Sequence, residues 1–166
     1  MGKVMNRITL TNTTDLEMAA QGLISADRVR SETVEALVDS GAVMLVLPAD
    51  LAARLGFPVV EMRHARMANG ALVHTPCVGN VRFEVFGRQM TCGALVLPGC
   101  TTPLIGQLQL EELDLIVDAK NREVRVNPES PDVVIVDVLR ASESSAVWPP
   151  QIRVANQNEA RTSISR

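Results

Sequence analysis

The dipeptide Asn69-Gly70 constrains the fold of this chain more than any other local feature. The tight turns that join antiparallel strands most often need a positive φ at both central residues, and asparagine followed by glycine suits that need best. The stretches on either side, 61–67 and 72–78, are therefore predicted to be the arms of a hairpin. Both arms carry charged residues and histidines, such as Arg66 and His74, so this hairpin is expected to project into solvent.

Runs of branched and other apolar residues, separated by turn residues, predict more strands. The predicted strands are 7–11, 27–39, 43–47, 81–86, 89–96, 115–118 and 123–126, with turns at 12–15 and 87–88. A leading proline, good helix formers and a closing glycine predict a short helix at 48–56. The spacing of leucines predicts a second one at 107–113. The fold is thus expected to be mainly β, with one or two short helices.

The core of such a fold must be aliphatic, because hydrophobic residues make up 46% of the chain and aromatic residues only 2%. The 166 residues suffice for one domain with a sizeable core and are too few for two ordinary domains. The scarcity of aromatic residues argues against a stacking platform for single-stranded nucleic acid. The net charge of −3 gives no general attraction to phosphate, so we expect no nucleic-acid partner.

Cys77, Cys92 and Cys100 cannot all pair within one chain, and none has the close CxxC spacing of a metal or redox site. They are expected to be reduced thiols, as in cytoplasmic proteins. His64 and His74 are too few ligands for a metal site, so no metal or cofactor is expected. The chain start has no apolar run of signal-peptide length, and no stretch approaches the roughly 20 apolar residues that span a bilayer. We therefore expect a soluble, cytoplasmic protein without a membrane partner.

The apolar run 36–38 delivers the carboxylate of Asp39 into a tight Ser40-Gly41 turn. The run fits a buried strand, and the glycine directly afterwards lets the backbone bend where a side chain would clash. Such a turn can present a carboxylate to a cleft without burying it unpaired. Taken alone, Asp-Ser-Gly also fits an ordinary solvated turn, because Asp and Ser are common turn residues.

Further features follow this motif in a specific order. They are Asp39-Ser40-Gly41-Ala42, the helix at 48–56, the Asn69-Gly70 hairpin and Leu104-Ile105-Gly106. In this combination the sequence resembles the retropepsin-like aspartic proteases, in particular the bacterial and archaeal single-domain members of clan AA. The resemblance covers roughly residues 7–128. It implies a closed acid-protease-like β-barrel with a flap hairpin.

The resemblance also implies roles for individual residues. Asp39 would carry the catalytic carboxylate. Support for the active-site loop would come from Ser40, Gly41, Ala42, Leu104, Ile105 and Gly106, and the tip of the substrate-binding flap would be Ala68, Asn69, Gly70 and Ala71. No metal is implied.

Hydrolysis of this kind needs two facing carboxylates that share one proton, one acting as base toward a water and the other donating to the substrate carbonyl. The chain has one Asp-Ser-Gly and no Asp-Thr-Gly. The resemblance therefore implies an aspartic endopeptidase that works as a homodimer, with water activated between Asp39 of each subunit. Its partner would be a second copy across a two-fold axis, and its substrates would be peptides or proteins.

Two alternatives stay open at this stage. Val43 and Met44 are apolar where members of the group often have a second hydroxyl residue. This favours a catalytically inactive module with the same fold, which dimerises or holds extended peptides. The third possibility is a structural β-barrel unrelated to proteases, in which Asp39 is only a turn residue.

The composition changes towards the end of the chain. Residues 1–130 are expected to form the retropepsin-like domain, and 131–166 a C-terminal extension rich in Ser, Asn, Gln, Glu and Arg. The extension contains one possible strand at 133–138 and is otherwise expected to be mostly disordered. That strand would either contribute to a dimer interface or be an addition particular to this chain.

Overall fold

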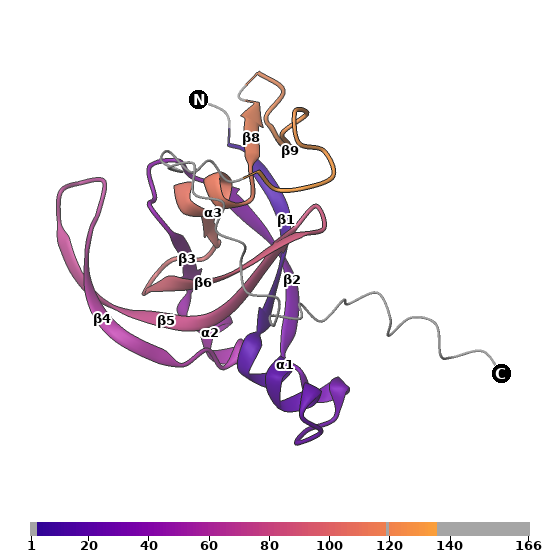
Figure 1. The fold of residues 1–166 in the computed structure, drawn as a ribbon. Coiled ribbons are helices and arrows are strands. Elements are labelled where there is room, and N and C mark those ends of the chain that lie inside the picture. The colour runs from indigo at the N-terminus through magenta and orange to yellow at the C-terminus, as the bar shows by residue number, and fades with distance from the viewer. Residues whose placement is uncertain (1–2, 119, 136–166) are drawn as a thin grey trace, which may run out of the picture. The chain divides into compact units, whose positions relative to one another are not determined.

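One sheet of seven strands organises the computed structural model, which describes residues 3–118 and 120–135 (Figure 1). Its strands are β1 (Met5–Asn12), β2 (Ser31–Val38), β3 (Leu45–Pro48), β4 (Val59–Arg66), β5 (Leu72–Val85), β6 (Arg88–Leu97) and β7 (Leu104–Ile105). They lie in the order β1-β2-β7-β3-β6-β5-β4, and β1 also pairs with β5. The prediction of a mainly β fold is confirmed.

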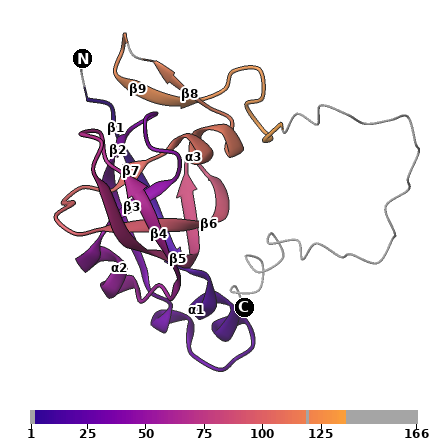
Figure 2. The same cartoon turned by 90° about the vertical axis from the view of Figure 1, so that its left-hand side faces the viewer.

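The remaining elements are short. They are α1 (Thr13–Ala20), the 3-10 helix η1 (Ala26–Arg28), α2 (Ala49–Leu55), α3 (Gln107–Glu112) and the two-stranded sheet β8 (Leu115–Asp118) and β9 (Glu123–Val126). Figures 1 and 2 show α1 and α2 at one end of the large sheet, and β8 and β9 at the other. No helix in the described ranges is long and apolar enough to cross a membrane.

The hairpin predicted at Asn69-Gly70 is formed by β4 and β5, with Arg66 paired to Leu72. Its turn differs from the expected one, because Gly70 has a positive φ of 83° and Asn69 does not. The amide of Met67 donates to the carbonyl of Ala71 at 2.8 Å, and the amide of Gly70 donates to the carbonyl of Met67 at 2.8 Å. The tip is thus a longer loop over residues 67–71 in place of a two-residue turn.

The second predicted hairpin is also present, but its turn lies one residue earlier than expected. Phe86 and Gly87 have φ values of 52° and 76°, and Val85 pairs with Arg88. The predicted strands 72–78 and 81–86 are a single strand, β5, with a register shift between Val78 and Val81. Arg88 therefore belongs to β6, where its side chain is buried.

The helix predicted at 48–56 is confirmed as α2, which ends at Gly56 in the left-handed conformation with φ 61°. The turn predicted at 12–15 is wrong. Asn12 is the N-cap of α1, and its side-chain oxygen accepts hydrogen bonds from the amides of Thr14 and Asp15 at 3.0 and 3.3 Å. The polar stretch therefore starts a helix, because the cap satisfies amides that would otherwise have no partner.

The core is aliphatic, as the composition predicted. Fully buried side chains from five strands meet in it: Ile8, Leu10, Leu45, Leu47, Val81, Phe83, Ala94 and Ile105. Of the strand predicted at 133–138, residues 133–135 are not in a strand and are exposed, and 136–138 lie outside the described residues. The disorder expected for the rest of the extension also concerns residues outside the described ranges.

Candidate functional site

Asp39 directly follows β2, at the point where β2 runs parallel to the short strand β7. The amide of Leu37 donates to the carbonyl of Pro103 at 2.8 Å, and the amide of Asp39 donates to the carbonyl of Ile105 at 3.0 Å. Because Ile105 is 1% exposed and packs in the core, the backbone of Asp39 is fixed to a rigid part of the fold. The motif at 39–42 and the segment 104–106, predicted to act together, are thus adjacent in space.

The carboxylate of Asp39 is half-buried and has a single hydrogen-bond donor within the described part of the chain. That donor is the amide of Gly41, which lies 2.9 Å from Oδ1. A Cβ atom on Gly41 would lie 3.1 Å from the same oxygen, closer than an ordinary contact. Glycine at position 41 therefore leaves room for the carboxylate of Asp39. The second carboxylate oxygen, Oδ2, has no hydrogen-bond donor within the described residues.

Ser40 is exposed, and its hydroxyl takes part in no hydrogen bond within the described ranges. The turn is closed by the amide of Ala42, which donates to the carbonyl of Asp39 at 3.0 Å. Val43 follows with 68% of its surface exposed. The outer side of this loop thus presents one free hydroxyl and one large apolar side chain to the surroundings.

The first residues of α3 form hydrogen bonds with the Asp39 loop. The amide of Gln107 donates to the carbonyl of Ala42 at 2.8 Å, and that of Leu108 donates to the carbonyl of Val43 at 3.0 Å. Gly106 permits this contact, because a Cβ atom there would lie 2.6 to 2.7 Å from backbone atoms of Met44. A side chain at this position would separate α3 from the loop.

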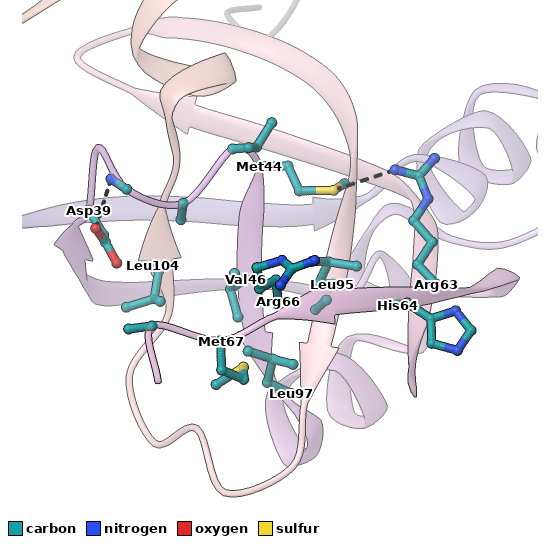
Figure 3. A pocket seen from close by; sticks show the side chains of 15 residues that line it. Asp39, Met44, Val46, Arg63, His64, Arg66, Met67, Leu95, Leu97 and Leu104 are labelled. Carbon is teal, nitrogen blue, oxygen red and sulfur yellow. Dashed lines mark hydrogen bonds between the residues drawn. The ribbon is translucent and has the colours of Figure 1, made fainter. Parts of the chain in front are cut away.

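Asp39 lines a cleft that has a volume of about 640 Å³ (Figure 3). The residues that line the cleft come from the Asp39 loop, from β3, β4, β6 and β7, and from the start of the hairpin tip. They are Asp39, Gly41–Met44, Val46, Arg63–Ala68, Leu95, Leu97 and Leu104. The cleft therefore joins the motif, the hairpin and the segment at 104 in one site.

The hairpin tip contributes less than the resemblance implied. Of its four predicted residues only Ala68 lines the cleft, whereas Asn69, Gly70 and Ala71 lie outside the lining and are exposed. The arm β4 supplies more of the wall than the tip does, from Arg63 onwards.

Sequence reasoning missed most of the apolar lining. It placed the arginines of β4 on a solvated hairpin, and Arg63 and Arg66 are exposed, but it did not predict that they line the cleft. Val46 and Leu95 read as ordinary strand residues, because each lies in a run that also contains core residues. Leu97 lies just beyond a predicted strand. Alternation along β6 separates the cleft side from the core side, since Leu95 and Leu97 are half-buried while Ala94 and Val96 are buried. That alternation was the available signal.

Two residues of β4 interact with neighbouring side chains. Arg63 donates to the carboxylate of Glu61 at 2.7 Å, and this hydrogen bond raises the pKa of the Arg63 guanidinium. His64 stacks on His74 of β5 with ring centroids 4.8 Å apart. No group of three or more metal-ligating side chains occurs within residues 3–118 and 120–135.

Two comparisons with known proteins gave matches. The sequence model of the family described as aspartyl protease matches residues 26–108, which contain every site segment named above. Among solved structures, the chain is similar to the retroviral protease-like domain of Ddi1 from Leishmania major. The two share 16% sequence identity with a TM-score of 0.47, and the match covers 75% of this chain and 90% of that chain. A comparison with curated proteins found no match.

Proposed function

Because this chain belongs to the aspartyl protease family, as its resemblance to the retropepsin-like members predicted, we propose that it is an aspartic endopeptidase that works as a homodimer. The observation that carries the proposal is the position of Asp39. Its half-buried carboxylate lies at the edge of a cleft of about 640 Å³ and has one oxygen without a donor in the described part of the chain.

The proposed reaction needs Asp39 from both subunits. One carboxylate takes a proton from a water molecule while the water oxygen attacks the peptide carbonyl, and the other, protonated carboxyl donates to the carbonyl oxygen. Two carboxylates at close range cannot both ionise, so they share one proton and supply the base and the acid together. Collapse of the tetrahedral intermediate then breaks the C–N bond, and the leaving amine takes a proton from the dyad.

The homodimer is proposed because each chain supplies one such carboxylate. The exposed hydroxyl of Ser40 is available for a hydrogen bond across a two-fold axis, and the exposed Val43 beside it offers apolar surface to a partner. Isologous contacts of this kind place the same residue of both copies close to the axis. Asp39 of one subunit would then face Asp39 of its partner.

We also propose that the β4–β5 hairpin acts as a flap and that the large sheet is the closed barrel implied by the resemblance. Support for the barrel comes from the pairing of β1 with both β2 and β5. Support for the flap comes from the cleft, since Met67 and Ala68 at the start of the tip line it together with the Asp39 loop. The retropepsin-like domain is proposed to span residues 1–130 of a cytoplasmic protein whose three cysteines are free thiols.

The test is cleavage of a mixed peptide library by the full chain and by its Asp39→Asn variant. The parent is expected to cleave, to be inhibited by a pepstatin-type transition-state analogue and to sediment as a dimer. Asp39→Asn should abolish cleavage with unchanged thermal unfolding. The matched control is Asp50→Asn, since Asp50 is an exposed carboxylate outside the cleft. Equal cleavage by the parent and Asp39→Asn would refute the proposal.

The second candidate function is a catalytically inactive module that holds extended peptides. It is favoured by Val43 and Met44, apolar residues where members of the group often have a second hydroxyl, and by the fact that the described residues supply a single donor to Asp39. Binding of library peptides by the parent dimer without any turnover would support this candidate and refute the endopeptidase.

A further inference from the structure

We propose that the cleft selects peptides in which an acidic side chain lies next to an apolar one, and that Arg66 is the residue that binds the acidic group. The inference rests on the proposed function in one respect, which is that the molecule bound in the cleft is a peptide. It concerns the substrate class, and its evidence is the charge and polarity of the lining.

Among the described residues, the lining of the cleft contains two arginines, Arg63 and Arg66 of β4, and one carboxylate, that of Asp39. Asp39 takes part in the proposed chemistry and Glu61 pairs with Arg63, so Arg66 has no carboxylate partner within the described residues. An occupant with a carboxylate would supply the missing charge.

The two arginines differ in their partners. Arg63 is paired with Glu61 at 2.7 Å and also reaches the sulfur of Met44 at 3.8 Å. Arg66 has no ion pair and no side-chain hydrogen bond within the described ranges 3–118 and 120–135. Arg66 is thus the free cation of the two, and Arg63 is already committed to an acidic neighbour of its own strand.

Arg66 is exposed, and a peptide bound beside it would displace water and strengthen its attraction for an anion. The same cleft is lined by Val46, Leu95, Leu97 and Leu104, which provide an apolar floor (Figure 3). A charge pair is stronger where low-polarity side chains displace water. The guanidinium has a planar fork of donors that matches both oxygens of a carboxylate.

Arg66 lines the same cleft as Asp39, so a bound peptide can contact both residues. Arg66 is the last residue of β4, directly before Met67 and Ala68, which line the cleft together with Asp39. An extended peptide that lies along the floor alternates its side chains between two faces. Apolar side chains would occupy the floor while an acidic side chain turns towards β4.

The experiment measures binding and cleavage separately. The full chain with Asp39→Asn is titrated against fluorescein-labelled pools of extended peptides of about eight apolar and small residues, which carry either Glu or Gln at one scanned position. At one position the Glu pool should bind about fivefold tighter than the Gln pool, as for a single partly exposed ion pair. Adding Arg66→Gln should reduce this ratio to about one, and Arg66→Lys should retain part of it.

The matched control is Arg82→Gln on the same background. Arg82 is an arginine of the neighbouring strand β5 that hydrogen-bonds to Gln89 and does not line the cleft. This substitution also removes one positive charge, and it should leave the Glu to Gln ratio unchanged. A ratio near one at every position in the Asp39→Asn chain, or a ratio that persists in Arg66→Gln, would overturn the inference.

Cleavage of the same pools by the chain with Asp39 intact distinguishes this inference from the proposed function. Cleavage without preference for Glu would leave the endopeptidase standing and overturn the role of Arg66. Glu-dependent binding without cleavage would support the role of Arg66 and refute the endopeptidase. Loss of the dimer in Arg66→Gln, with the Glu to Gln ratio unaltered, would assign Arg66 to the subunit interface and overturn the inference.

Discussion

A Cβ atom on Gly106 would lie 2.6 Å from the carbonyl oxygen of Met44 and 2.7 Å from its carbonyl carbon and amide nitrogen. Backbone atoms cannot rotate away as the end of a flexible side chain can. Because Gly106 has no side chain, the start of α3 can approach the loop of Asp39 closely. The glycine of the Leu104-Ile105-Gly106 segment is required for close approach, and its φ of −90° is one that any residue can adopt.

Gly106→Ala should lower the free energy of unfolding by about 2 kcal/mol, because overpacking forces the backbone to shift. It should also reduce activity by moving the Asp39 loop. Urea unfolding measures the first effect. The control is Gly99→Ala, at a glycine with φ of 80° and no atom within 4 Å of an added Cβ, where only conformational strain of about 1 kcal/mol is expected. An equal loss in the two variants would show that the Met44 contact does not limit position 106.

The pair of Asp15 and Arg30 should make stability depend on pH. Arg30 donates to Asp15 from its side chain at 2.7 and 2.8 Å and from its amide at 3.0 Å, and these hydrogen bonds hold the pKa of Asp15 below its usual range. The stabilisation is therefore complete above the unfolded pKa of about 3.9 and is lost as the pH falls through the folded value. Asp15→Asn should cost about 2 kcal/mol at neutral pH, since Asp15 is buried.

Urea unfolding at neutral pH and near pH 3 checks this expectation, and the difference between parent and Asp15→Asn should shrink at the lower pH. Asp50→Asn is the control, because the Asp50 side chain is 73% exposed in its pair with Arg54 and that pair is screened by water. A difference for Asp15→Asn that is the same at both pH values would contradict the assignment.

Removal of Arg88 should lower the free energy of unfolding more than removal of an exposed arginine. Its buried guanidinium donates to the carbonyls of Leu113, Asp114 and Val133 at 2.6, 3.1 and 3.2 Å, and also to that of Ser130. Arg88→Ala should lower the free energy of unfolding by about 3 kcal/mol, since it leaves buried carbonyls without donors.

The variant should also make residues 127–135 easier to cleave in limited proteolysis. Arg82→Ala, which removes a less buried arginine of β5, should have a small effect on both measurements. Similar unfolding curves for Arg88→Ala and Arg82→Ala would contradict this role.

Replacement of Gln109 on α3 by an apolar residue should stabilise the folded protein. It is fully buried, and neither amide atom has a hydrogen-bond partner within the described residues. Burial raises the pKa of the nearby Cys92 thiol to about 12, so the thiol is a neutral neighbour. Gln109→Met keeps the volume and removes the unsatisfied amide, which should add about 1 kcal/mol to the free energy of unfolding.

The control for Gln109→Met is Gln107→Met, at an exposed position two residues earlier on the same helix, where a change within about 0.5 kcal/mol is expected. Thermal unfolding of both variants decides the comparison. A loss of stability in Gln109→Met would mean that the amide has a partner that stabilises the native state.

Elements fixed by short-range rules were predictable from the sequence. The proline and glycine that bound α2, and the apolar runs of β8 and β9, gave the right element in nearly the right place. The strand predicted at 27–39 begins only at Ser31, because residues 26–28 form the 3-10 helix η1. Asn12 was misread because the same residue type starts turns and caps helices, and the amphipathic signal that would separate them is weak in the sequence Thr13–Ala20. The turn at Phe86 was misplaced because a bulky residue there adopts a positive φ.

Long-range relationships were not predictable in the same way. The parallel pairing of Leu37 with Leu104 joins residues distant in sequence, and the family resemblance implied only that the segment 104–106 supports the Asp39 loop. The role of Arg88 depends on carbonyls from two later segments, which no local pattern reveals. The cleft side of β6 was in principle readable from its alternation, but Leu95 and Leu97 needed the position of β4 to become a binding surface.

The most direct test of the central claim is subunit mixing between the parent chain and Asp39→Asn. The two chains are unfolded together, refolded at varied ratios and assayed on the same peptide library. If each site needs Asp39 from both subunits, activity should fall as the square of the parent fraction, because only parent homodimers have both carboxylates. Activity that falls linearly with the parent fraction would mean that one Asp39 suffices, and it would contradict the shared site.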